Sequence, residues 1–208
     1  MCFYFQASKK VLEMLDKKYE GIEDVSADLI NHDDPHKDWI VNYNGFEHPN
    51  TVVVANNQPN KLQLMNWGLI PFWAKDKSIQ NSTLNAKIET LNEKPSFKYS
   101  IDNRCLIYTD GFFEWQWLDD KGKNKQKYIL KLIDEVPFAF AGLWNAWTDK
   151  STGELLKTFT ILTTEANKLM SEIHNSKKRM PVIVSNETKW LKGEKLIMNN
   201  DMLKAIKL

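Results

Sequence analysis

The pattern of apolar and polar positions predicts more strand than helix along this chain. Residues 8–19 place Val11, Leu12, Leu15 and Tyr19 on one face at helical spacing, which predicts an amphipathic helix. Short apolar runs bounded by turn-forming residues predict strands over much of the remainder. The predicted strands cover residues 51–55, 62–67, 104–109, 112–117, 127–133, 138–147, 155–163 and 181–184.

Short polar turns between these strands indicate the fold class. Residues 56–61 and 149–154 are such turns, and turns of this length favour antiparallel neighbours. We therefore predict one α+β domain over residues 1–208, with a mixed or antiparallel sheet that curls toward a barrel and helices outside it. The other predicted elements are short helices over residues 165–173, 187–191 and 201–206, a loop over 31–37 and an irregular segment over 71–85.

Composition narrows the classes of protein that this chain can belong to. The 208 residues are 42% hydrophobic and 26% charged, which is ordinary for a soluble globular protein. No run of eighteen apolar residues occurs and the first residues do not resemble a signal peptide, so we expect a cytoplasmic protein that does not enter membranes. Cys2 and Cys105 are too few for a disulfide scaffold or a four-cysteine zinc site. The HDDPH run at residues 32–36 lacks metal-ligand spacing, so we expect no metal or cofactor.

The formal net charge of +1 conceals an uneven distribution. Residues 1–50 carry a net charge of −5 and the remaining residues carry +6. The small sum argues against a protein that coats nucleic acid through bulk charge. The basic remainder is nevertheless compatible with a nucleic-acid groove of modest size.

Cys2 matters because of its position. Removal of Met1 would leave an α-amine and a thiol on adjacent carbons, with ordinary pKa values of about 7.7–8.0 and about 8.5. The amine can form a Schiff base with an aldehyde, and the thiol can then close a five-membered thiazolidine ring. Taken alone, a cysteine at this position is also compatible with an accident of sequence.

Two further motifs carry titratable side chains. Glu114 lies in DGFFEW among apolar neighbours, and such surroundings raise the pKa of a carboxyl toward the range of general acid–base catalysis. His174 follows a predicted helix and precedes three basic residues, where a histidine can bind an anion and move protons. The alternatives are a half-buried glutamate bonded to the backbone and an exposed histidine beside solvated lysines.

The segment around residue 85 carries polar and aromatic candidates. Asn85 is a neutral donor and acceptor in NAKIET, and Lys87 lies two residues further on. Trp67 and Trp73 flank the preceding Gly-Pro segment, and an exposed aromatic ring on a loop can stack on a nucleobase. Core packing is the alternative for both rings, and it is favoured for Trp67.

The order of these motifs is more specific than any one of them. The chain contains Met-Cys, WG-x-x-P-x-W, NA-K-x-E-T, DGFFEW and IH-x-x-x-x-RMP, in that order. This order resembles the SOS response-associated peptidase family, the SRAP domain. The similarity runs from residue 2 to about residue 181.

The resemblance implies covalent chemistry on DNA. Family members bind single-stranded DNA and cross-link to abasic sites, whose ring-opened sugar carries an aldehyde. By motif, Cys2 is the cross-linking nucleophile, and the catalytic partners are Asn85, Glu114 and His174. The resemblance also implies a self-processing peptidase that removes what precedes the cysteine, and we expect weak abasic-site lyase activity.

Other residues are predicted to contact the DNA strand. Trp73 is a candidate for base stacking, and Thr163 lies where the family contributes a threonine near the site. The candidates for backbone phosphates are Lys87, Lys177, Lys178 and Arg179. We expect a monomer that associates with the nucleoid when it is bound to DNA.

The chain departs from the family pattern at residues 3, 4 and 87. The family commonly begins MCGRF, whereas this chain has Phe3 and Tyr4. The usual arginine of the NA-x motif is Lys87, which keeps the charge but loses the bidentate guanidinium.

Two other functions remain open from the residues. One is a peptidase or amidohydrolase in which Cys2 attacks an amide and its own amine acts as the base. The other is a non-catalytic module that binds single strands through tryptophans and basic loops. Hydrolysis of model amides without DNA would favour the first, and binding that is indifferent to abasic sites and to Cys2 would favour the second.

Overall fold

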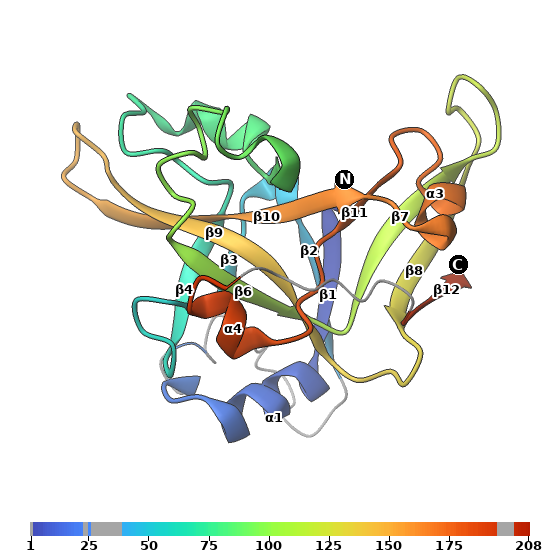
Figure 1. The fold of residues 1–208 in the computed structure, drawn as a ribbon, viewed down its shortest axis with the longest axis horizontal. Coiled ribbons are helices and arrows are strands. Elements are labelled where there is room, and N and C mark those ends of the chain that lie inside the picture. The colour runs from blue at the N-terminus through green and yellow to red at the C-terminus, as the bar shows by residue number, and fades with distance from the viewer. Residues whose placement is uncertain (1, 23–24, 26–38, 195–201) are drawn as a thin grey trace.

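The computed structural model describes residues 2–22, 25, 39–194 and 202–208. The described chain forms two β-sheets with helices on the outside, which confirms the predicted α+β class (Figure 1). The predicted loop over residues 31–37, with its HDDPH run, lies outside the described residues. No helix among the residues that the structure describes is long and apolar enough to cross a membrane.

One sheet closes into a barrel. Strand β9 pairs with both β6 and β10, and β10 pairs with β4, so that the circuit β10-β4-β3-β6-β9 is complete. The pairings are antiparallel except between β10 and β4. Closure brings backbones close together: a Cβ at Gly142 would lie 2.5 Å from Ile107 Cδ1 and 2.8 Å from the Thr160 carbonyl oxygen. The barrel strands are β3 (Asn50–Ala55), β4 (Leu62–Trp67), β6 (Arg104–Thr109), β9 (Phe138–Thr148) and β10 (Leu155–Glu165).

The second sheet contains strands that the sequence pattern did not predict. Its order is β12-β8-β7-β1-β2, and all of its pairings are antiparallel. The predicted helix over residues 201–206 is wrong. Residues 203–207 instead form strand β12, which pairs with the edge of β8 and places Leu203 opposite Leu132. The members are β1 (Tyr4–Ser8), β2 (Ile40–Asn44), β7 (Gly111–Trp117), β8 (Lys125–Leu132) and β12 (Leu203–Lys207).

Short elements surround the sheets. Helix α1 packs below β1 in the view of Figure 1, on the side away from α3. Strands β5 and β11 both add to β10, and β11 begins two residues before the predicted strand over 181–184. The helices are α1 (Lys9–Lys18), α3 (Lys168–Ile173) and α4 (Glu187–Leu191), the short strands are β5 (Asn85–Lys87) and β11 (Arg179–Pro181), and the 3₁₀ turns are η1 (Gly45–Glu47), η2 (Lys77–Ser82) and η3 (Ile88–Thr90).

Aromatic side chains join the two sheets and place the start of the chain. Phe5 of β1 is fully buried and its ring lies 5.2 Å from that of Trp67 and 6.1 Å from that of Phe140. Gln6 is also buried, and its amide donates to the Asp110 carboxylate at 3.0 Å. Because Asp110 leads into β7, these contacts bring the residues before β1 alongside β7.

Candidate active site around Cys2

Cys2 lies two residues before the start of β1 and is fully buried. The Asn85 amide donates to the Cys2 carbonyl oxygen at 2.9 Å, and the Gly45 amide donates to the Phe3 carbonyl oxygen at 2.9 Å. Asn85 reaches this position because β5 pairs with β10, with Asn85 opposite Ile161. The Asn85 Oδ1 atom is buried and has no hydrogen-bond partner among the described residues, so an acceptor remains available beside Cys2.

The thiol of Cys2 is protonated at neutral pH. Burial raises its pKa well above the usual range, and the nearby charge of Glu114 raises it further. The thiol itself lies 3.8 Å from the Tyr4 carbonyl oxygen. A buried, neutral thiol is a poor nucleophile until a proton acceptor is at hand.

Glu114 lies on β7 with only 5% of its surface exposed. Burial raises the pKa of its carboxyl to about 7, from an ordinary value of 4.5. The carboxyl group can therefore exist in both protonation states near neutral pH. This is the property that the apolar neighbours of Glu114 in DGFFEW predicted.

His174 caps the end of helix α3 and faces Glu114. Its Nδ1 lies 2.8 Å from the Arg179 carbonyl oxygen, which can only accept, so Nδ1 carries the proton. The longer 3.3 Å contact from the Arg179 amide to the same nitrogen is therefore secondary. Burial lowers the pKa of His174 to about 4, and the charge of Lys177 acts in the same direction. A neutral Nε2 lone pair thus lies 3.9 Å from Glu114 Oε2, which is too far for a direct hydrogen bond.

A pocket of about 380 Å³ opens over this pair. Strand β1 pairs with β7 only at Gly111 and Phe112, so the later residues of β7 border an opening rather than another strand. Side chains from both faces of β7 can therefore reach the pocket. It is lined by Phe3, Tyr4, Glu114, Trp115, Trp117, Lys125, His174, Ser176 and Lys177.

Several of these lining residues were not among the predicted site residues. Strand alternation assigns Trp115 and Trp117 to the face away from Glu114, and the polar DDKGKNK segment at residues 119–125 is typical of a solvated hairpin turn. The signal that could have found Lys125 is the hairpin register, which places it opposite Trp117 with its ammonium 5.4 Å from the ring centre. Tyr4, which replaces the usual basic residue, packs edge-on against Trp115 with 5.0 Å between ring centres.

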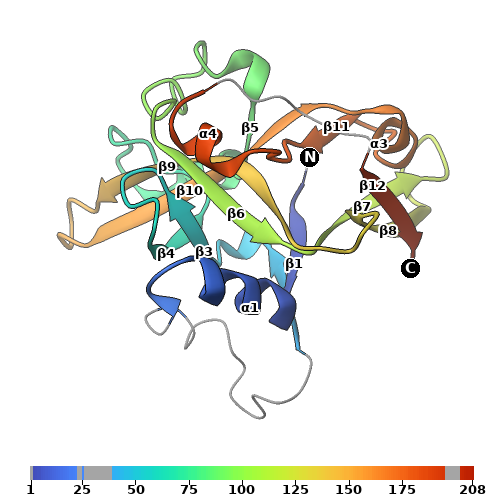
Figure 2. The same ribbon diagram turned by 60° about the horizontal axis from the view of Figure 1, so that its bottom comes forward.

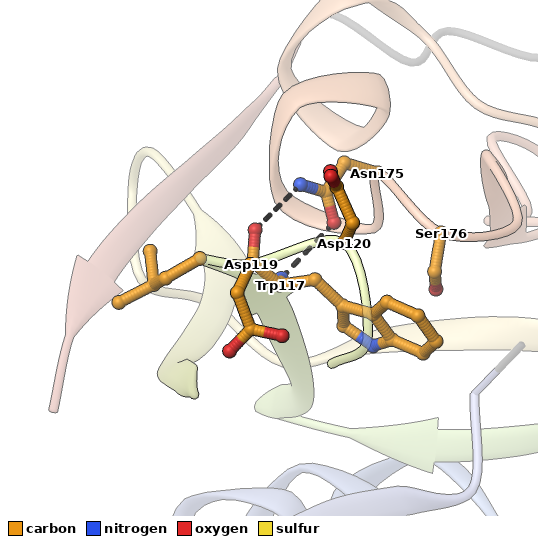
Figure 3. Close-up of a pocket in the computed structure, with 6 residues that line it drawn as sticks. Trp117, Asp119, Asp120, Asn175 and Ser176 are labelled. Carbon is orange, nitrogen blue, oxygen red and sulfur yellow. Dashed lines mark hydrogen bonds between the residues drawn. The ribbon is translucent and has the colours of Figure 1, made fainter. Parts of the chain in front are cut away.

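The loop after His174 is fixed to β7 by a side chain. The Asn175 side chain accepts from the Trp117 amide at 3.0 Å and donates to the Trp117 carbonyl oxygen at 2.9 Å (Figure 3). The side-chain amide of Gln116 also donates to the Glu172 carbonyl oxygen at 3.1 Å. A second pocket of about 380 Å³ lies beside these contacts and shares Trp117 and Ser176 with the first. The Asn175 contacts therefore set where His174 stands relative to Glu114.

We expect Asn175→Ala to release this loop and to hydrate His174. The pKa of His174 should then rise from about 4 toward its ordinary value of 6.5, because burial is the main cause of the lowering. NMR titration of the His174 ring protons measures it. Asn186→Ala, which removes the cap of α4 instead, is the control and should leave this titration unchanged. An unchanged His174 titration in Asn175→Ala would show that the loop is held by other contacts.

Two predicted DNA-binding residues lie behind the site. Arg179 is buried and donates to both carboxylate oxygens of Glu89, at 3.0 and 2.7 Å, and to the Thr163 carbonyl oxygen at 2.8 Å. Burial works to raise the pKa of Glu89, but the Arg179 guanidinium holds it below its usual value. Thr163 is fully buried, with its hydroxyl 3.4 Å from the Ala86 carbonyl oxygen. Both residues tie β5, β10 and β11 together rather than facing solvent.

The other predicted DNA-binding residues are exposed. Lys87, Lys177 and Lys178 all have exposed side chains, and Lys177 also lines the pocket beside His174. Trp73 is 43% exposed, with its indole N–H 3.3 Å from the Pro95 carbonyl oxygen, and it does not line the pocket. Trp67 is fully buried, so the core alternative holds for this ring. In the part of the chain that the structure describes, no group of three or more His, Cys, Asp or Glu side chains could hold a metal ion.

Comparison with known proteins identifies the family. Residues 1–207 match the family described as SOS response associated peptidase (SRAP). The chain belongs to the SRAP family. A crystal structure of a Bacteroides thetaiotaomicron protein superposes on this SRAP chain with a TM-score of 0.82 and 31% identity, and the match covers 100% of this chain and 92% of the other. The family predicted from the motif order is thus confirmed.

Curated relatives of the SRAP chain are named abasic site processing proteins. YoqW of Bacillus subtilis (strain 168) is 43% identical over 161 residues, which covers 76% of this chain and 69% of YoqW. YoaM of the same organism is 38% identical over 178 residues, which covers 83% and 76% of the two chains. HMCES of Xenopus tropicalis is 31% identical over 178 residues, 73% of this chain and 51% of HMCES.

Proposed function

We propose that this SRAP chain processes abasic sites in single-stranded DNA by linking Cys2 covalently to the lesion sugar. The observation that carries the proposal is the position of Cys2: its buried backbone is held by Asn85, and its thiol is close enough to Glu114 for the charge of that carboxyl to raise the pKa of the thiol. The pKa of the Glu114 carboxyl is itself about 7. The names of the relatives, abasic site processing proteins, supply the substrate class.

The reaction begins with the amine that removal of Met1 would expose. The Cys2 nitrogen attacks C1 of the open-chain sugar and forms a carbinolamine. Loss of the C1 oxygen as water gives an imine. The thiol then adds across the C=N bond, so that sulfur joins C1 and its proton goes to nitrogen, which closes the thiazolidine. The net change is the loss of one water.

Glu114 and His174 divide the proton transfers. Glu114 protonates the departing oxygen and later accepts a proton, which its pKa near 7 permits without a large energetic cost. His174 presents a neutral Nε2 at 3.9 Å from Glu114 Oε2, and in this proposal it accepts a proton from a sugar hydroxyl and assists opening of the sugar ring. Proton removal from the imine would give β-elimination, and capture by the thiol competes with it. We therefore expect only weak lyase activity beside a stable conjugate.

The raised pKa of the Cys2 thiol supports this order of events over amide hydrolysis. A cysteine peptidase needs a thiolate or a base to form one, whereas burial and Glu114 keep this thiol protonated. The amine is therefore the first nucleophile. Peptidase activity is accordingly restricted, in this proposal, to removal of what precedes Cys2.

The exposed cations are proposed to hold the DNA strand. Lys87, Lys177 and Lys178 contact backbone phosphates, and Trp73 stacks on a base. Arg179 and Thr163 instead position β5 and β11, because both side chains are buried and bond to groups within the protein. We further propose that the chain acts as a monomer in the cytoplasm. Size-exclusion chromatography with light scattering tests the oligomeric state.

Intact-mass measurement before and after incubation with an abasic oligonucleotide tests the proposal. We expect the purified protein to lack Met1, and the product to equal protein plus oligonucleotide minus one water. An oligonucleotide with a tetrahydrofuran in place of the abasic sugar is the control, since it has no aldehyde. Absence of an adduct, or an equal adduct with tetrahydrofuran DNA, would contradict the proposed chemistry.

A further inference from the structure

Three exposed aromatic side chains lie on one surface outside the Cys2 pocket. Phe72 is 59% exposed, Trp73 43% and Tyr99 60%. Phe72 and Tyr99 come from segments 27 positions apart in sequence, yet their ring centres are 5.5 Å apart at an interplanar angle of 75°. We call this pair of rings the Phe72–Tyr99 pair. An edge-to-face contact covers only one of the four ring faces of the pair.

Lysines border the Phe72–Tyr99 pair. The Lys98 ammonium lies 4.7 Å from the centre of the Tyr99 ring, and Lys75 and Lys94 are also exposed in the same two segments. Of the acidic neighbours, Asp76 accepts from the Ser78 amide at 2.8 Å and its carboxylate is therefore engaged within its own turn. Glu93 is exposed, so the lysines outnumber the carboxylates available to a partner.

The chain connects this surface to the active site. Asn85 holds Cys2, Lys87 follows on the same short strand, and η3 then leads directly into the segment that carries Tyr99. In both ribbon views, the green segment that contains η3 lies on the side of the molecule away from α1, as do β11 and α3 (Figures 1 and 2). A strand that leaves the pocket past Lys87 would run toward the segment that carries Tyr99.

We propose that the Phe72–Tyr99 pair, together with Lys98, is a second base-stacking site for the single strand, several nucleotides from the lesion and separate from Trp73. This inference rests on the proposed function and adds a partner contact to it. An unpaired base has two apolar faces flanked by phosphates, and an open ring face beside an ammonium matches both features. A double-stranded segment would keep its bases covered and could not use this site.

Equilibrium binding of undamaged single-stranded DNA tests the site without the covalent step. Fluorescence anisotropy should give about tenfold weaker binding for Tyr99→Leu and for Phe72→Leu, as expected for the loss of one stacked base. Tyr99→Phe keeps the ring and should bind like the wild type. Ile133→Ala is the control for loss of an exposed apolar side chain elsewhere, since Ile133 follows the last residue of β8 and is 59% exposed.

A position-specific probe locates the base. A 2-aminopurine placed at successive positions on either side of the abasic nucleotide should be quenched at one flanking position in the wild type. That quenching should disappear in Tyr99→Leu and persist in Tyr99→Phe. Unchanged affinity and unchanged quenching in both leucine variants would overturn the inference, and so would equal losses in Ile133→Ala.

The covalent assay separates this inference from the function on which it rests. At saturating abasic DNA, Tyr99→Leu should form the same amount of conjugate at the same rate as the wild type, because it leaves the Cys2 pocket intact. If the wild type forms no conjugate, the proposed function fails. If the wild type reacts but the leucine variants bind as it does, only the second stacking site fails.

Discussion

Replacement of Cys2 by alanine should abolish the heat-stable conjugate with abasic DNA. The variant keeps an α-amine, so it can still form an imine, but it has no thiol to close the ring. The imine hydrolyses on heating, whereas the thiazolidine of the wild type survives. A denaturing gel after heating measures this difference, and borohydride should restore a band in Cys2→Ala by reducing the imine.

The chain supplies its own control for this experiment. Cys105 is the other cysteine, and it is fully buried in the barrel on β6. Cys105→Ala should conjugate as the wild type does, once its folding is verified by thermal unfolding. A heat-stable band of wild-type intensity in Cys2→Ala, or its loss in Cys105→Ala alone, would contradict the assignment of the nucleophile.

Glu114→Gln should slow conjugation by roughly 100-fold or more without weakening DNA binding. The amide keeps the shape of the carboxyl but cannot give or take a proton. The wild-type rate should change around pH 7, where the Glu114 carboxyl titrates, and this change should be absent from the variant. Single-turnover kinetics from pH 5 to 9, with anisotropy for binding, measure both quantities. Equal rates for the two proteins would remove Glu114 from the mechanism.

The same substitution should stabilise the fold at high pH. Because the folded pKa of about 7 exceeds the ordinary 4.5, ionisation costs the folded state about 3 kcal/mol once the pH is above 7, and nothing below 4.5. Glu114→Gln removes this cost. Urea unfolding should therefore show a stability gain over the wild type at pH 8.5 that is much smaller at pH 5. A gain of equal size at both pH values would indicate that burial does not raise this pKa.

The sequence predicted the barrel strands because each is bounded by turn residues and carries its own apolar run. Strands β3, β4 and β9 follow the predicted ranges within one residue at each end. Strand β12 was mistaken for a helix because Leu203 and Ile206 are three apart, a spacing that fits one face of a helix. In the strand these two side chains point to opposite faces, and only Leu203 is buried. What decides between the two is the open edge of β8, which is a tertiary feature.

The candidate site was predicted in part for a similar reason. The motif order identified Cys2, Asn85, Glu114 and His174, and the structure brings Asn85 to Cys2 and His174 to Glu114. The state of Arg179 could not be inferred, because its partner Glu89 lies 90 residues away on another element. The pocket wall contributed by Lys125 likewise depends on the β7–β8 register and on the early departure of β1 from β7.

The contact between Asn175 and Trp117 has a consequence for the behaviour of the protein in concentrated solution. Beyond Phe112, none of the described strands pairs with β7 on the side that β1 leaves. An uncovered strand edge of this kind can recruit a strand from another molecule. The Asn175 side chain occupies both the N–H and the C=O of Trp117. The side-chain amide of Asn175 thereby hinders a strand of another molecule from pairing with β7 at Trp117. The loop that orients His174 thus also favours solubility.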